Sequence, residues 1–141
     1  CGCVRGAVRT APHAAACDLT PARMTGTVAG GARDSRDEAY IHGSEGKCVD
    51  AFAPGVNVQS AKAFGNTFEG NTVSSTQPYA TRSGSSMAAG VAAGVAAHFL
   101  GENPLASPEA TKNALLNAAS PGTVRTRDLE TAPLLRVPAR W

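Results

Sequence analysis

Aromatic residues, long apolar runs and basic clusters are all scarce in this 141-residue chain. Aromatic residues make up 5% of it, and the formal net charge is only +2. Without a basic cluster, the sequence gives no case for binding nucleic acid or an anionic membrane. The longest apolar run, residues 87–100, has about two-thirds of the roughly 20 residues that a membrane-spanning helix needs, so no membrane span is expected.

Cysteine and histidine are also few, with four and three copies. Cys1 and Cys3 resemble the start of a metal site, but no second cluster stands at zinc-finger spacing, so zinc is not expected and their role stays open. His13 follows a proline in an alanine-rich stretch, which is typical of a solvated loop. The chain opens with no charged segment before an apolar one, so it shows no signal peptide and is expected to be a mature or truncated product.

Small residues are abundant instead, with 15 glycines and many alanines. A chain of this length is one domain or a piece of one, and it is long enough to bury a core. Tightly packed small residues suit a layered α/β fold better than a disordered chain.

The most informative stretch is residues 82–100, where a glycine and small hydroxyl residues enter a long apolar run. Gly-Glu-Asn-Pro at 101–104 closes the run, and the pattern predicts a buried helix. The unpaired N–H groups and partial positive charge at a helix N-terminus stabilise an anion at a serine such as Ser86. Gly84, which lacks a Cβ, would let a substrate backbone approach. The simpler alternative is that the serine only caps the helix.

Residues 83–88, Ser-Gly-Ser-Ser-Met-Ala, resemble the nucleophile motif of the subtilisin-like serine peptidases, or subtilases. The usual form of that motif is Gly-Thr-Ser-Met-Ala-x-Pro-His-Val-Ala-Gly. Ser86 matches the nucleophile, and Ser85 stands where the motif has threonine. The resemblance implies that Gly84 and Ser85 lie near the substrate and the oxyanion. Residues 90–91 depart from the motif, because Gly-Val replaces the usual Pro-His.

Three other passages resemble subtilases of the proteinase-K-like branch, in the family's order. Residues 16–30 match the form Ala-Cys-x-x-Ser-Pro-Ala-Arg followed by a Thr-Val-Gly strand. Residues 49–60 are close to Val-Asp-x-Phe-Ala-Pro-Gly-Val-x-Val/Ile-x-Ser, and residues 107–119 match Ser-Pro-Glu-x-x-Lys-x-Ala-Leu-Leu-x-x-Ala. The resemblance covers about residues 16–137, whereas residues 1–15 match poorly.

This resemblance implies that residues 16–141 are the C-terminal part of a subtilisin-like domain. The expected fold is a three-layer α/β sandwich with a mostly parallel sheet and the Ser86 helix central and buried. Such a piece would leave sheet edge and apolar helix surface uncovered. The local patterns predict strands near 24–29, 48–53 and 56–60, a hairpin within 61–82, a second helix from 108 to about 119 capped by Ser107, and a closing strand within 132–137.

The chemistry implied by the resemblance is serine endopeptidase activity, in which Ser86 transfers the acyl group of a protein or peptide substrate. The family's aspartate, histidine and oxyanion-binding asparagine are not found: no histidine stands in a His-Gly-Thr motif, and no asparagine precedes Asn57. The chain alone is therefore expected to be inactive. It is either part of a longer subtilase, with the missing N-terminal part as its partner, or a non-catalytic binding or structural module.

Two further features are implied by the same resemblance. Cys17 and Cys48 stand where some proteinase-K-like members form a disulfide, which suits a secreted protein; two buried thiols are the alternative. Asp50 matches a carboxylate that binds structural calcium, with the carbonyls of Thr25 and Thr27 as the other protein ligands. A solvated or strand-end aspartate is the alternative for Asp50. The chemistry itself requires no cofactor.

Overall fold

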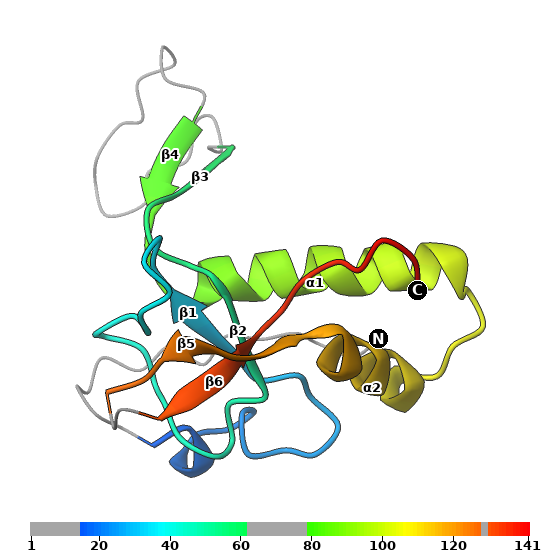
Figure 1. Cartoon of the computed structure of the whole chain (residues 1–141), viewed down its shortest axis with the longest axis horizontal. Coiled ribbons are helices and arrows are strands. Elements are labelled where there is room, and N and C mark those ends of the chain that lie inside the picture. The colour runs from blue at the N-terminus through cyan, green and yellow to red at the C-terminus, as the bar shows by residue number, and fades with distance from the viewer. Residues whose placement is uncertain (1–14, 62–78, 128–129) are drawn as a thin grey trace.

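A four-stranded sheet forms the centre of the computed structural model, which describes residues 15–61, 79–127 and 130–141 (Figure 1). The strands run in the order β1 (Gly30–Arg33), β2 (Ala51–Pro54), β6 (Thr131–Leu134) and β5 (Ser120–Arg125). The first three are parallel, and β5 is antiparallel to β6. The expected α/β class with a mostly parallel sheet is therefore confirmed.

The long helix α1 (Ser85–Glu102) packs across β1 and β2. One stripe of this helix is buried, and it faces three buried alanines on the strands. The stripe consists of Ala88, Ala89, Ala92, Val95 and Phe99, and the strand alanines are Ala32, Ala51 and Ala53. Where alanine lies on both sides, the helix and the sheet can approach closely, because an alanine side chain is only a methyl group.

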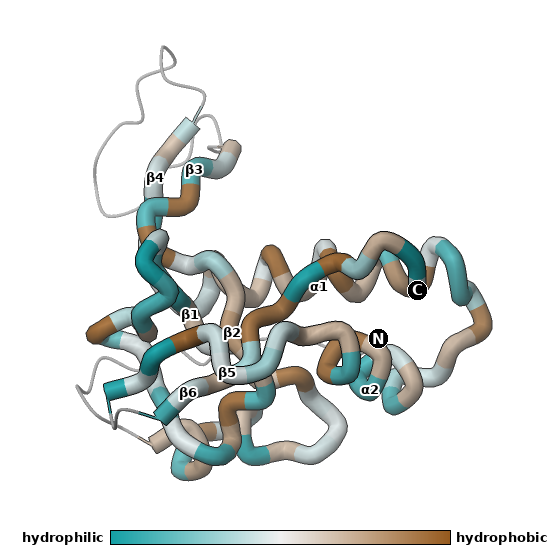
Figure 2. The backbone as a smooth tube through the Cα atoms, in the orientation of Figure 1, coloured by the Kyte–Doolittle hydropathy of each residue, from teal (hydrophilic) through white to brown (hydrophobic). Residues whose placement is uncertain are grey.

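The predicted burial of α1 applies to the face on the sheet, whereas its opposite face is exposed. The exposed residues of α1 are Ser86, Gly90, Ala93, Gly94, Ala97, His98, Leu100, Gly101 and Glu102. Apart from Ser86, His98 and Glu102, these residues are small or apolar. The tube of α1 is accordingly mostly neutral to hydrophobic in colour (Figure 2). The expected uncovered apolar helix surface is thus present. Within the described residues, neither α1 nor any other helix combines the length and hydrophobicity needed to cross a membrane.

The second helix, α2 (Pro108–Ala118), begins and packs as its sequence predicts. The Ser107 side chain accepts a hydrogen bond from the Ala110 N–H at 3.1 Å, and Pro108 occupies the first helical position. Leu115 is fully buried where α2 packs against α1. The cap and the packed leucine together fix α2 on α1.

The C-terminal tail after β6 returns along α1 (Figure 1). The ring of Trp141 meets Phe99 edge to face, with ring centres 5.1 Å apart. Its Nε1 donates a hydrogen bond to Nδ1 of His98 at 2.9 Å. The tail therefore covers part of the C-terminal half of α1.

Three strands begin later in the chain than predicted, including the strand expected at 56–60, which begins at Val58. The strand expected at 24–29 is wrong, because this segment forms turns and β1 begins only at Gly30. The Thr27 hydroxyl lies 2.8 Å from the Met24 carbonyl and 3.1 Å from that of Pro21, so local hydrogen bonds replace a strand ladder. Similarly, β2 begins at Ala51 rather than at residue 48.

The strand predicted at 56–60 is β3 (Val58–Ala61), and it pairs antiparallel with β4 (Tyr79–Arg82). This hairpin therefore begins before the range 61–82 in which a hairpin was expected. It projects from the sheet beside the start of α1 (Figure 1). Its connection, residues 62–78, lies outside the described residues, as do Cys1, Cys3 and His13. The second strand of the hairpin, β4, is followed almost immediately by α1.

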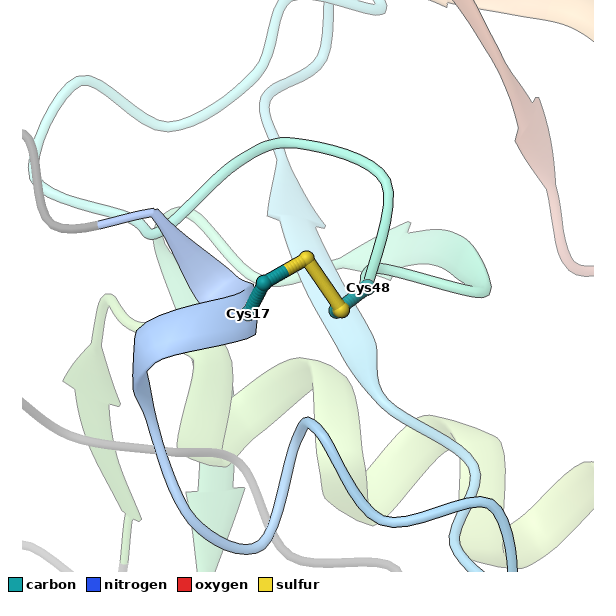
Figure 3. The surroundings of a disulfide bond; sticks show 2 residues. All are labelled: Cys17 and Cys48. Atoms are coloured by element: carbon teal, nitrogen blue, oxygen red, sulfur yellow. A yellow bond between two sulfur atoms is a disulfide. The ribbon is translucent and has the colours of Figure 1, made fainter.

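A disulfide joins Cys17 to Cys48, the pairing that the resemblance implied. Cys17 lies in the short helix η1 (Ala16–Asp18), and Cys48 lies in the loop before β2 (Figure 3). The two residues are 31 positions apart, and β1 lies between them. The disulfide therefore closes a segment of the chain that includes β1.

We predict that Leu115→Ala lowers the free energy of unfolding by about 2–4 kcal/mol, because it leaves a cavity between the two helices. The measurement is urea unfolding followed by fluorescence of the single tryptophan, Trp141. Leu105→Ala is the matched control: this leucine is 98% exposed, so its removal should change stability by less than about 0.5 kcal/mol. Equal effects of the two substitutions would contradict the packing described here.

Reduction of the disulfide should lower the free energy of unfolding by about 3 kcal/mol, because the open chain gains conformational entropy when unfolded. Thermal unfolding with and without dithiothreitol measures this loss. The double variant Cys17→Ser/Cys48→Ser should show the same loss without reductant and no further response to it. A response of the double variant to dithiothreitol would assign the effect to other cysteines.

Candidate active site at the N-terminus of α1

The turn at Gly84 connects β4 to α1 and fixes where the helix begins. Gly84 has φ 150° and ψ 165°, a backbone conformation that residues with a side chain rarely adopt. Its N–H donates to the Gly55 carbonyl at 2.7 Å, and its carbonyl accepts from the Met87 N–H at 3.0 Å. The Gly55 N–H donates in turn to the Arg33 carbonyl at 3.1 Å. The helix start is thereby tied to the ends of β1 and β2.

Gly55 itself sits where no side chain fits. A Cβ at this position would lie 2.5 Å from the Cβ of Ala32 and 3.0 Å from the Gly84 carbonyl oxygen. The 49–60 motif contains this glycine, but the sequence did not reveal that Gly55 supports the helix start. The close contact explains why glycine follows β2 at this point.

Ser86 lies in the first turn of α1 with its side chain exposed. Within the described residues its hydroxyl makes no hydrogen bond, and its N–H has no acceptor. Ser85, the first residue of the helix, is half-buried beside it. The site lies just beyond the carboxyl ends of parallel strands, where ligands bind in open α/β sheets. An anion formed at Ser86 would therefore meet an unpaired N–H and the positive end of the helix dipole.

Neither histidine in the described part of the chain is paired with Ser86. His98 follows it by twelve residues on the same helix, which is about 18 Å at 1.5 Å per residue. Its Nδ1 accepts the hydrogen bond from Trp141. His42 lies against Tyr40, with ring centres 5.4 Å apart. Neither histidine of the described residues therefore contacts Ser86.

The loop that follows β1 is ordered by Asp34. Its carboxylate accepts the Arg36 N–H at 2.8 Å and the Glu38 N–H at 3.0 Å. The Glu38 and Arg36 backbone hydrogen bonds hold the pKa of Asp34 below its ordinary value of 3.8. This loop leaves the same end of β1 to which Gly55 is bonded.

A second polar cluster surrounds Asp50, the residue before β2. Lys112 of α2 places its Nζ 2.9 Å from Oδ1 and 3.0 Å from Oδ2 of Asp50, and it donates to the Thr27 carbonyl at 2.6 Å. The Ala29 N–H donates to Oδ2 at 2.8 Å. Thr25 is exposed and, in the ranges that the structure covers, makes none of these hydrogen bonds.

Two of the three residues expected to hold calcium, Asp50 and Thr27, are therefore brought together, and a lysine bridges them. Lys112 is part of the 107–119 motif, but the sequence did not predict its contacts with Asp50 and Thr27, because both residues are far from it in the chain. Within the described residues, no group of three or more histidine, cysteine, aspartate or glutamate side chains could hold a metal ion.

The arrangement defines an α/β protein with an exposed serine at a helix N-terminus, beyond the carboxyl ends of its parallel strands. Residues 13–134 match the Subtilase family. The chain belongs to this family.

Relatives with known names agree with this assignment. The chain is 38% identical over 112 residues to alkaline serine exoprotease A of Vibrio alginolyticus, a match that covers 79% of this chain and 19% of that protein. It is 36% identical over 110 residues to an extracellular serine proteinase of Thermus sp. strain Rt41A, covering 78% of this chain and 24% of the relative. The chain thus spans about a fifth to a quarter of these relatives.

A solved structure is similar as well. The crystal structure of a cold adapted subtilisin-like serine proteinase superposes with a TM-score of 0.76 at 34% sequence identity. The match covers 93% of this chain and 43% of that protein's chain. The fold described above therefore corresponds to a little under half of that structure.

Gly84→Ala should destabilise the chain by about 1–3 kcal/mol, because alanine does not tolerate the φ of this turn. Urea unfolding measures the effect. Gly90→Ala makes the same chemical change in the interior of α1, where an added Cβ meets nothing within 4 Å. It should stabilise by about 0.5–1 kcal/mol, since alanine is the better helix former. Changes of the same sign in both variants would contradict a special backbone role for Gly84.

Proposed function

We propose that this chain is the nucleophile-bearing portion of a serine endopeptidase. The observation that carries the proposal is Ser86: an exposed hydroxyl in the first turn of α1, beside an N–H without an acceptor in the described residues. Membership of the Subtilase family supports it. Residues 83–88 also resemble the family's nucleophile motif, although Gly90 and Val91 depart from it.

In the proposed reaction, the Ser86 hydroxyl oxygen attacks the carbonyl carbon of a peptide bond. A histidine accepts the hydroxyl proton, and the carbonyl oxygen becomes an oxyanion that accepts a hydrogen bond from the Ser86 N–H. The histidine then protonates the leaving amine, and water releases the acyl group from Ser86. Gly84 and Ser85 would line the approach of the substrate backbone, because they precede the nucleophile at the helix start.

The histidine, the aspartate that orients it and a second oxyanion donor would come from the rest of a subtilase domain. Two observations support this partner. The described histidines contact Trp141 and Tyr40 rather than Ser86. The uncovered face of α1 consists mostly of small and apolar residues, which can pack closely against further protein. Without these groups, a loss of about 10⁶ in rate is expected from the missing histidine alone.

We propose the secreted state as the setting for this peptidase. The Cys17–Cys48 disulfide supports it, because structural disulfides persist in oxidising compartments. One of the relatives is named as an extracellular proteinase, which also favours an extracellular location.

The second candidate function is a non-catalytic subtilase-like binding or structural module. It is favoured by the lack of any described histidine or aspartate paired with Ser86. In this case, the uncovered face of α1 would bind a partner protein, and Ser86 would have no chemical role.

The decisive measurement is the intact mass of the natural product together with fluorophosphonate labelling of that product. We expect a product longer than 141 residues that labels at Ser86, because the probe reacts only with an activated serine hydroxyl. Ser86→Ala should abolish the label and reduce peptide hydrolysis by about 10⁶. Ser35→Ala is the control, since Ser35 is exposed in the loop after β1.

Labelling that survives in Ser86→Ala would overturn the assignment of the nucleophile. A natural product of 141 residues that folds but does not label would favour the non-catalytic module. Its binding partners would then be sought through the exposed face of α1.

A further inference from the structure

We propose that the Lys112 ammonium is the resident cation of the site at Asp50, so that this chain is held together there without calcium. The carboxylate and one carbonyl expected to bind the metal are both present, but the structure places Nζ of Lys112 against them. The proposal concerns the stability of the fold and is independent of the reaction proposed for Ser86.

In this position the ammonium donates two hydrogen bonds, to the Thr27 carbonyl and to Asp50 Oδ2, and forms an ion pair with Asp50. It has three N–H donors, and three acceptor oxygens lie within reach: the Thr27 carbonyl at 2.6 Å and the two Asp50 oxygens at 2.9 and 3.0 Å. Both side chains are about one-fifth exposed, at 21% for Lys112 and 23% for Asp50. The pair therefore lies largely outside bulk solvent, where charge pairing is screened less than on an open surface.

Calcium does not fit the same position. It takes six to eight oxygen ligands at about 2.3–2.6 Å, and here the carboxylate and the carbonyl already surround Nζ. A calcium ion bound to the same three oxygens would lie almost on the ammonium and would repel it. Thr25, the third expected ligand, is exposed and makes no hydrogen bond to Asp50 or Lys112 in the described structure. The positive charge of Lys112 balances the negative charge of Asp50, so no metal is needed to neutralise the carboxylate.

The lysine also links parts of the chain that a calcium bound only to the expected ligands would not join. Thr27 precedes β1, Asp50 precedes β2, and Lys112 lies on α2. The Asp50 N–H donates to the Ala29 carbonyl at 2.9 Å, and the Ala29 N–H returns a bond to the carboxylate. Because the cation is part of α2, the same contact that neutralises Asp50 also holds the helix against the entry to both strands.

The test is thermal unfolding of the chain, or of any longer product that contains it, in calcium and in a chelator. The unfolding temperature of the wild type should be equal in 5 mM CaCl₂ and 5 mM EGTA, to within roughly 1 °C, because the lysine occupies the calcium position. Lys112→Met keeps the length of the apolar stem and removes the charge. It should lower the unfolding temperature by about 4–8 °C in both solutions.

Two variants calibrate this loss. Lys47→Met makes the same substitution at an exposed lysine that has no hydrogen bond or ion pair in the described structure. It should leave the unfolding temperature unchanged to within about 2 °C. Lys112→Arg keeps the positive charge and should recover more than half of the temperature lost in Lys112→Met.

Charge reversal gives the sharpest result. Lys112→Glu would place a second carboxylate beside Asp50 and the Thr27 carbonyl, which is a set of hard oxygen ligands suited to calcium. Its unfolding temperature should be the lowest of the series in EGTA and should rise by several degrees in CaCl₂. A reversal variant that gains nothing from calcium would contradict the close approach of position 112 to these oxygens.

Two outcomes overturn the proposal even if a variant fails to fold, because they concern the wild type. The first is an unfolding temperature that rises with calcium in the wild type. The second is saturable calcium binding in isothermal titration, at a Kd of about 1 mM or below, that disappears in Asp50→Asn. Either result would show that the metal displaces Lys112.

Discussion

The close packing of α1 on β1 and β2 is the constraint on which the candidate site depends. Alanine faces alanine across this contact, so each added methylene would force the helix away from the sheet. The bond between the Gly84 N–H and the Gly55 carbonyl fixes the helix at its N-terminal end. The position of Ser86 relative to the carboxyl ends of the strands therefore depends on the alanine and glycine residues at this contact. A larger residue at Ala32 or Gly55 would displace the serine without contacting it.

Features that depend on residues close together in the sequence, such as the starts of the two helices, were predicted well. The entry into α1 and the Ser107 cap of α2 depend on residues within one turn of each other, so their spacing can be read directly. The strand expected at 24–29 was wrong because Thr27 uses its hydroxyl and N–H in local turns, a choice that strand propensity does not reveal. The contact between Lys112 and Thr27 spans 85 positions, and that with Asp50 spans 62. Only the folded chain brings these groups together.

The exposed face of α1 and the unpaired hydroxyl of Ser86 have a common physical explanation in the proposed peptidase. Both belong to the same helix. The exposed face offers apolar surface that could pack against further protein, and the serine nucleophile of the proposed peptidase needs a base. A segment that covered the small residues of α1 would also bring its own side chains close to the helix N-terminus. The same packing that stabilised the fold would then supply the chemistry, so stability and activity would be gained together.

A continuous series of contacts leads from the disulfide to the candidate site. Cys48 lies two positions before Asp50, so the disulfide and the carboxylate hold neighbouring points of the segment that enters β2. Lys112 connects this segment to α2, and Leu115 packs α2 against α1, which carries Ser86. A loosely bound metal in place of Lys112 would make this series depend on the surrounding calcium concentration. A lysine in the chain makes it depend on folding alone, which suits a protein whose core is built from side chains as small as alanine.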